Sequence, residues 1–149
     1  MMDTAVWREY MKLLDNLGNT LDKLTETERT KTAAVGRGDL SAVEECMKQE
    51  QVVSLSLRGM DQKREKLLAQ LGLTGVRLRD LEARGPRECH METKQAVEKL
   101  RRKYEIFQSA SEVARNALES NLHIIEQMQK AQDAPPPEDM PHMGADFMA

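Results

Sequence analysis

The chain has 149 residues, of which 32% are charged, 40% are hydrophobic and only 3% are aromatic. So few aromatic residues argue against most β-sandwiches and barrels, and ten methionines among many Leu, Glu and Lys residues favour helices. The net charge of −3 argues against general nucleic-acid binding, and no apolar run is long enough to span a membrane.

The compartment and the distribution of charge can also be predicted from the sequence. The N-terminus has no basic stretch followed by an apolar one, and the two cysteines, Cys46 and Cys89, are too few for a disulfide framework. We therefore expect a cytoplasmic protein with free thiols. Residues 77–103 contain nine basic and five acidic residues, whereas residues 104–149 contain two and eight, so a basic belt precedes an acidic end.

The first predicted helix runs from about Asp3 to Val35, with apolar residues at alternating steps of three and four. Glu28 and Lys31 interrupt this stripe one turn apart and can pair with each other. A glycine of the Gly36–Asp39 turn suits the left-handed end of the helix, and Asp39 can cap the next helix, with Ser41 and Glu44 as an alternative capping box. The turn predicts an antiparallel hairpin.

The second predicted helix runs from about Leu40 to Leu71, and Gly72 ends it. The connection over 72–86 is rich in glycine, and within it Thr74 can cap a short helix that carries Val76, Leu78 and Leu81. The third predicted helix is the longest, from about Pro86 to Gln132, because its apolar stripe keeps heptad spacing without a break.

Five glutamates also recur every seven residues along the third helix, which predicts a line of carboxylates on a solvated face: Glu98, Glu105, Glu112, Glu119 and Glu126. At 1.5 Å per residue the third helix is roughly 20 Å longer than the first two. Its C-terminal end would then overhang with uncovered apolar side chains, unless the short helix near 74–83 covers it.

Residues 133–149 contain four prolines and predict a flexible tail. The tail also contains four apolar residues, Met140, Met143, Phe147 and Met148. The alternative interpretation is therefore a short segment that docks on the chain itself or imitates a client. The predicted fold is all-α: an elongated bundle of three long antiparallel helices, with a short connecting helix, over residues 1–132.

No residues predict catalysis, a cofactor or a metal site. The glycines lack the sequence context of a phosphate-binding loop, and the Cys89–His90 pair with nearby glutamates lacks the spacing of a zinc site or a nucleophile–base pair.

The order of three segments resembles the FlgN family of flagellar type III export chaperones. These are residues 28–40 (ERTKTAAVGRGDL), residues 63–73 (KREKLLAQLGL) and residues 116–125 (NALESNLHII). The resemblance covers about residues 5–130. It implies an all-helical cytoplasmic chaperone that holds the terminal helical region of hook-associated proteins, the subunits of the hook–filament junction, until delivery to the export apparatus.

The resemblance also implies that the C-terminal helix carries client binding, and the predicted overhang lies in the same place. The expected client-binding residues are Asn116, Leu118, Asn121, Leu122, Ile125 and Met128. A client helix would lie along the apolar residues, and the asparagines could form hydrogen bonds with it. Ordinary packing within the bundle or in a homodimer is the alternative for these residues. The alternative for the whole chain is a coiled-coil scaffold that self-associates.

Overall fold

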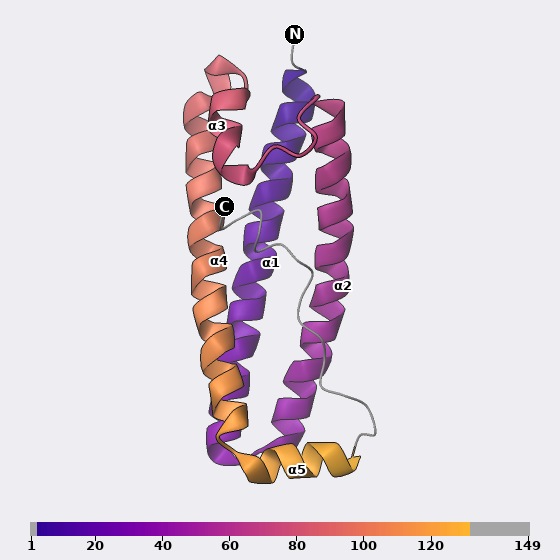
Figure 1. The fold of residues 1–149 in the computed structure, drawn as a ribbon, viewed down its shortest axis with the longest axis vertical. Coiled ribbons are helices and arrows are strands. Elements are labelled where there is room, and N and C mark those ends of the chain that lie inside the picture. The colour runs from indigo at the N-terminus through magenta and orange to yellow at the C-terminus, as the bar shows by residue number, and fades with distance from the viewer. Residues whose placement is uncertain (1–2, 132–149) are drawn as a thin grey trace.

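The computed structural model describes residues 3–131, except for the side chains of Leu122 and Ala131, and every regular element in that range is a helix. The long helices are α1 (Thr4–Arg37), α2 (Leu40–Gln70) and α4 (His90–Glu119). The short elements are η1 (Leu78–Asp80), α3 (Leu81–Arg84), η2 (Arg87–Cys89) and α5 (Leu122–Ala131). The predicted all-α class is confirmed (Figure 1). The predicted tail, 133–149, lies outside the described residues.

The turn between α1 and α2 forms as the sequence predicts. Gly38 is left-handed, with φ of 68°, and its N–H donates to the carbonyl of Val35 over 3.0 Å. Asp39 then caps α2 by accepting a hydrogen bond from the N–H of Ala42 at 3.1 Å. Because α2 already begins at Leu40, the alternative capping box further along the chain is not used. The two helices pack as an antiparallel hairpin.

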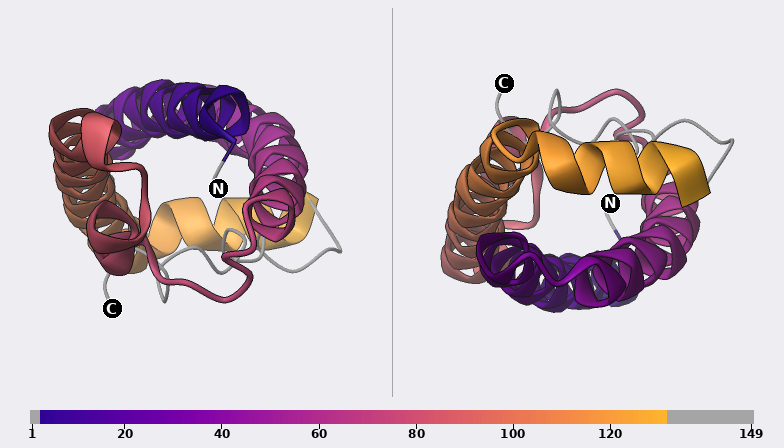
Figure 2. Two further views of the ribbon diagram at one scale, coloured as in Figure 1. Left: turned by 90° about the horizontal axis from the view of Figure 1, so that it is seen from above. Right: turned by 90° about the horizontal axis from the view of Figure 1, so that it is seen from below.

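Helix α1 lies between α2 and α4, and these outer helices make almost no contact with each other. Figure 2 shows the three long helices as an open arc rather than a closed bundle. α4 runs parallel to α1, because Trp7 donates a hydrogen bond to Thr93 near one end and Asn121 donates one to Val35 near the other. The predicted bundle of three long antiparallel helices is therefore not confirmed beyond its all-helical class and its α1–α2 hairpin.

The prediction of one long third helix is wrong. α4 ends at Glu119, and α5 crosses the end of the α1–α2 hairpin (Figure 1). Asn121 starts the new helix, since its side-chain oxygen accepts a hydrogen bond from the N–H of Ile124 at 3.2 Å. The heptad stripe continues through this cap, so periodicity alone could not reveal the break. The apolar end folds back instead of overhanging.

The connection between α2 and α4 packs at the opposite end of the molecule from α5 (Figure 1). Leu78 and Leu81 are fully buried there, in the same core cluster as Trp7 and Tyr10. Gly85 passes so close to Trp7 that a Cβ atom would lie 2.4 Å from the indole ring. The short helix therefore does not cover the C-terminal end of the third segment, and Thr74 does not cap it.

Candidate functional site at the junction of α4 and α5

Five of the six predicted client-binding residues have described side chains, and all six positions lie at or near the junction of α4 and α5. Asn116 is exposed, whereas Leu118, Asn121, Ile125 and Met128 are half-buried. The side chain of Leu122 lies outside the described part of the structure. The junction therefore brings these positions to one end of the molecule and leaves part of their surface open.

Two of the apolar residues at the junction also support the fold. Leu118 and Met128 pack against a cluster that we call the distal core. Its buried members are Ala34, Val35, Val43, Met47 and Ile124. Ile124 is 1% exposed, so it attaches α5 to the hairpin, whereas its neighbour Ile125 keeps part of its surface exposed.

Asn121 uses both ends of its side-chain amide within the fold. Its oxygen caps α5, and its nitrogen donates a hydrogen bond to the backbone carbonyl of Val35 over 3.4 Å. The carbonyl of Val35, in the last turn of α1, thus accepts two hydrogen bonds, one from Asn121 and one from the N–H of Gly38. Asn121 therefore connects the junction to the end of the hairpin, and Asn116 is the asparagine with a freely accessible side chain.

All five glutamates of the predicted line are exposed, but four of them lie on α4 and Glu126 lies on α5, so the break at Asn121 divides the line. The oxygen of Glu105 lies 3.8 Å from the guanidinium of Arg101, an exposed pair that contributes little to stability. The line ends at Glu119 and Glu126, on either side of the junction. Between Glu105 and Glu119, where Arg115 is the only basic residue of the sequence, a partner that approaches α4 meets a negative potential.

An exposed apolar strip on α4 does not belong to the stripe that sequence periodicity identified. Ile106 is 45% exposed and Val113 is 53% exposed, and their spacing of seven residues places them on one face of the helix. The half-buried Ala110 and Ala117 lie beside them. The sequence signal was a second apolar repeat, parallel to the dominant one. This strip leads along α4 toward Asn116.

A buried charged cluster lies between α1 and α2. The ammonium of Lys31 is 2.6 Å from a carboxylate oxygen of Glu50 and 3.3 Å from one of Glu28, so the predicted pairing of Glu28 with Lys31 is confirmed. Burial raises the pKa of Glu28 from 4.5 to about 7, and the charge of Glu50 adds to the effect. Along the sequence, Glu28, Lys31 and Glu50 lie between residues of the distal core and residues of a larger core around Trp7 and Leu17. We call this larger core the main core.

Neither cysteine forms a disulfide, and both are buried. Among residues 3–131, no group of three or more His, Cys, Asp and Glu side chains could hold a metal ion. No helix in the described range is long and apolar enough to cross a membrane. The described residues form a helical protein surface with apolar and charged strips.

Comparison with known proteins finds a match to a protein family. The family model described as FlgN protein matches residues 2–134, which include every described residue. No curated protein and no solved structure matches the chain.

Proposed function

Because the chain belongs to the FlgN family, we propose that it is a cytoplasmic chaperone that holds the terminal helical region of hook-associated proteins unassembled until type III secretion. The family match is the observation that carries this proposal, since it covers the whole helical part. The family supports a role in flagellum biogenesis as an export chaperone. We assign the chain no catalytic activity.

The proposed client surface is the junction of α4 and α5. Its residues are Asn116, Leu118, Asn121, Leu122, Ile125 and Met128. Support for this assignment comes from the half-exposed side chains of Ile125 and Met128 and from the exposed amide of Asn116. An amphipathic client helix would bury its apolar face against these residues, as in other helix-in-groove complexes.

The chemistry of the client follows from the surroundings of this surface. The exposed glutamates along α4 favour a basic or amphipathic helix and disfavour an acidic one. Met128 is unbranched and flexible, and it can adjust to clients of different shape. The strip of Ile106 and Val113 offers further apolar area to a client helix that extends along α4.

Substitution of Ile125 tests this surface. We expect Ile125→Asp to weaken binding of a purified hook-associated protein at least about tenfold in isothermal titration calorimetry, because it places a charge in an apolar contact. The far-UV circular dichroism should stay nearly unchanged, since Ile125 is only half-buried. Leu55→Asp is the matched control, because Leu55 is 66% exposed on α2 and far along the chain from the junction.

Equal loss of binding in the two variants would contradict the assignment of the surface, as would collapse of helicity in Ile125→Asp.

The alternative function, a self-associating scaffold, is favoured by the exposed strip of Ile106 and Val113 on α4. Light scattering of the chain alone and with the client distinguishes the two functions. A stable homo-oligomer that ignores the client would refute the chaperone proposal.

A further inference from the structure

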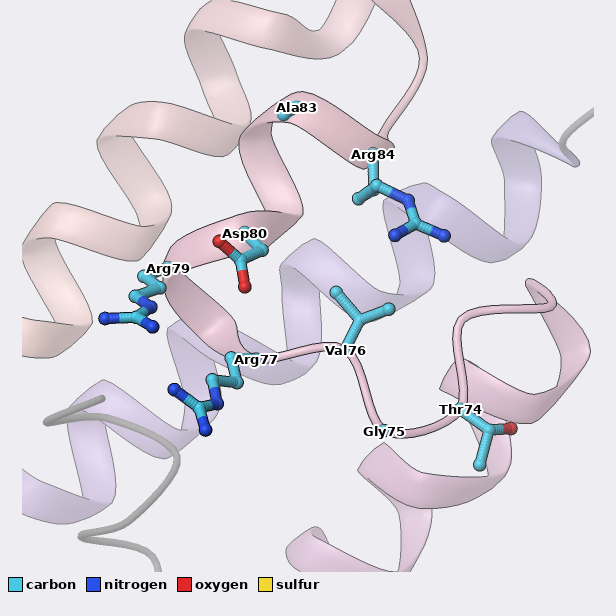
Figure 3. A pocket seen from close by; sticks show the side chains of 8 residues that line it. All are labelled: Thr74, Gly75, Val76, Arg77, Arg79, Asp80, Ala83 and Arg84. Atoms are coloured by element: carbon cyan, nitrogen blue, oxygen red, sulfur yellow. The ribbon is translucent and has the colours of Figure 1, made fainter.

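An open hollow lies on the segment that connects α2 with α4 (Figure 3). Its volume is about 570 Å³. It is lined by Thr74, Gly75, Val76, Arg77, Arg79, Asp80, Ala83 and Arg84. The client-binding proposal uses none of these residues, and the hollow lies at the opposite end of α4 from α5 (Figure 1).

The backbone under the hollow is held firmly in place. Leu78 and Leu81 are 1% and 0% exposed, and they anchor the two short helical turns in the main core. On the C-terminal side, Gly85 packs directly on the Trp7 ring, whose indole nitrogen donates a hydrogen bond to Thr93 over 3.1 Å. The side chains that line the hollow therefore project from a fixed platform, which lowers the entropic cost of binding.

Three arginines dominate the charge of the hollow. Arg77, Arg79 and Arg84 are exposed, and none of them forms an ion pair with another residue of the described range 3–131. Figure 3 shows Arg77 and Arg79 on one side and Arg84 on the other, with Asp80 and the half-buried Val76 between them. The fold does not use these guanidinium groups, so they are available to an outside partner.

We propose that this hollow binds an acidic peptide segment of a second protein, with carboxylates on the arginines and an apolar side chain over Val76. Guanidinium groups bind carboxylates through two parallel hydrogen bonds, and their planar donors favour peptide acids that are held at a fixed spacing. Asp80, inside the hollow, repels a carboxylate placed at the centre. The acidic residues of the ligand therefore flank its apolar residue.

Neighbouring charges favour a peptide over an anionic membrane or a nucleic acid. Glu82 and Glu88 alternate with the arginines along the same segment and are not buried. A membrane or a nucleic acid is recognised by a continuous positive surface, which this mixed pattern does not provide. An ordered peptide can meet the arginines while it avoids the carboxylates.

The chain's own acidic pair, Glu138 and Asp139, is too far away to fill the hollow within one molecule. α5 ends at Ala131, at the other end of a bundle whose α1 helix is about 51 Å long. Eight residues of extended chain after Ala131 span at most about 29 Å. The proposed occupant is a segment of another molecule, and it can bind while the α4–α5 junction holds a client.

Fluorescence anisotropy tests the hollow directly. The probe is a labelled peptide in which one leucine is flanked by glutamate and aspartate on both sides, and the control probe replaces these acids with their amides. We expect the acidic probe to bind and the amide probe not to bind. The double variant Arg77→Glu with Arg79→Glu should weaken binding at least about tenfold, because it reverses the charge on one side of the hollow.

The matched control is Arg29→Glu with Arg102→Glu, which changes the net charge equally at two exposed arginines outside the hollow. We expect it to change the affinity less than about twofold, through long-range attraction alone. Equal weakening in both double variants, or no binding of the acidic probe to the unmodified protein, would overturn the proposal. A preference for phosphatidylserine vesicles over neutral vesicles would also overturn the proposal, if the Arg77 and Arg79 substitutions abolished that preference. Client binding at the α4–α5 junction is measured separately and should not change.

Discussion

Glu28 is the residue whose environment differs most from what its type predicts. Its side chain is almost completely buried, and it shares the single ammonium of Lys31 with Glu50. Two carboxylates and one lysine leave the cluster one positive charge short when both acids are ionised. The elevated pKa of Glu28, about 7, follows from burial and from the charge of Glu50.

This environment predicts that the stability of the protein falls as the pH rises. The pKa of Glu28 is higher in the folded state than its ordinary 4.5, so the folded state binds more protons between these values. The stabilisation of the folded state by protonated Glu28 is fully present below about pH 4.5 and is lost as the pH rises through 7. Glu28 by itself should then lower the free energy of unfolding by about 3 kcal/mol across this range.

Urea unfolding at a series of pH values measures this slope. We expect Glu28→Gln to flatten it, because the amide cannot ionise. Glu26→Gln serves as the control on the same helix, since Glu26 is exposed and should leave the slope as it is. An unchanged slope in Glu28→Gln would mean that another group is responsible.

At the scale of elements, α5 is the part of the fold that the sequence pattern described least well. It has ten residues, too few to be a stable helix in isolation, so its contacts and its cap hold it. Ile124 supplies the fully buried contact and Asn121 supplies the cap. The hydrogen bond from Asn121 to Val35 also connects the start of α5 to the end of α1.

Asn121→Ala should therefore loosen α5 without unfolding the three long helices. We expect a local loss of about 1 kcal/mol, the usual cost of removing an N-cap. Amide hydrogen exchange should accelerate in α5 and change little in the middle of α1. Ser120→Ala is the control, since Ser120 is an exposed neighbour. Unaltered exchange in α5 would show that the cap does not hold it.

At the scale of the whole molecule, α1 holds the fold together because both other long helices pack on it. Its apolar face supplies residues to the main core and, at its C-terminal end, to the distal core. The charged cluster of Glu28, Lys31 and Glu50 falls between these two sets along the chain. The distal core is small, so we expect the end that carries α5 to open more readily than the rest.

Two alanine substitutions distinguish the stability of the main core from that of the distal core. Leu17 is fully buried in the main core, and Leu17→Ala should lower the global free energy of unfolding by about 2 to 5 kcal/mol. Ile124→Ala should mainly accelerate hydrogen exchange in α5 and near the α1–α2 turn. Native-state hydrogen exchange as a function of denaturant measures both. An equal global effect of the two substitutions would show that the molecule has a single cooperative core.

The sequence by itself determined the features that depend on neighbouring residues. These include the all-helical class, the hairpin turn at Gly38 and Asp39, and the pairing of Glu28 with Lys31. Each follows from backbone conformation, capping or helical spacing within a few residues, which a sequence states directly. The resemblance to the FlgN family, which the family match confirms, rests on the order of such local segments.

Only the tertiary structure decided which surfaces meet. Periodicity defines the apolar face of a helix but does not say which partner covers it, so the position of α4 beside α1 and the fold-back of α5 could not be predicted. An asparagine in a heptad stripe is compatible with a continuous helix and with a cap, and Asn121 is a cap because Val35 and Ile124 lie beside it. In the same way, Glu50 joined the buried pair of Glu28 and Lys31 only when α2 packed on α1.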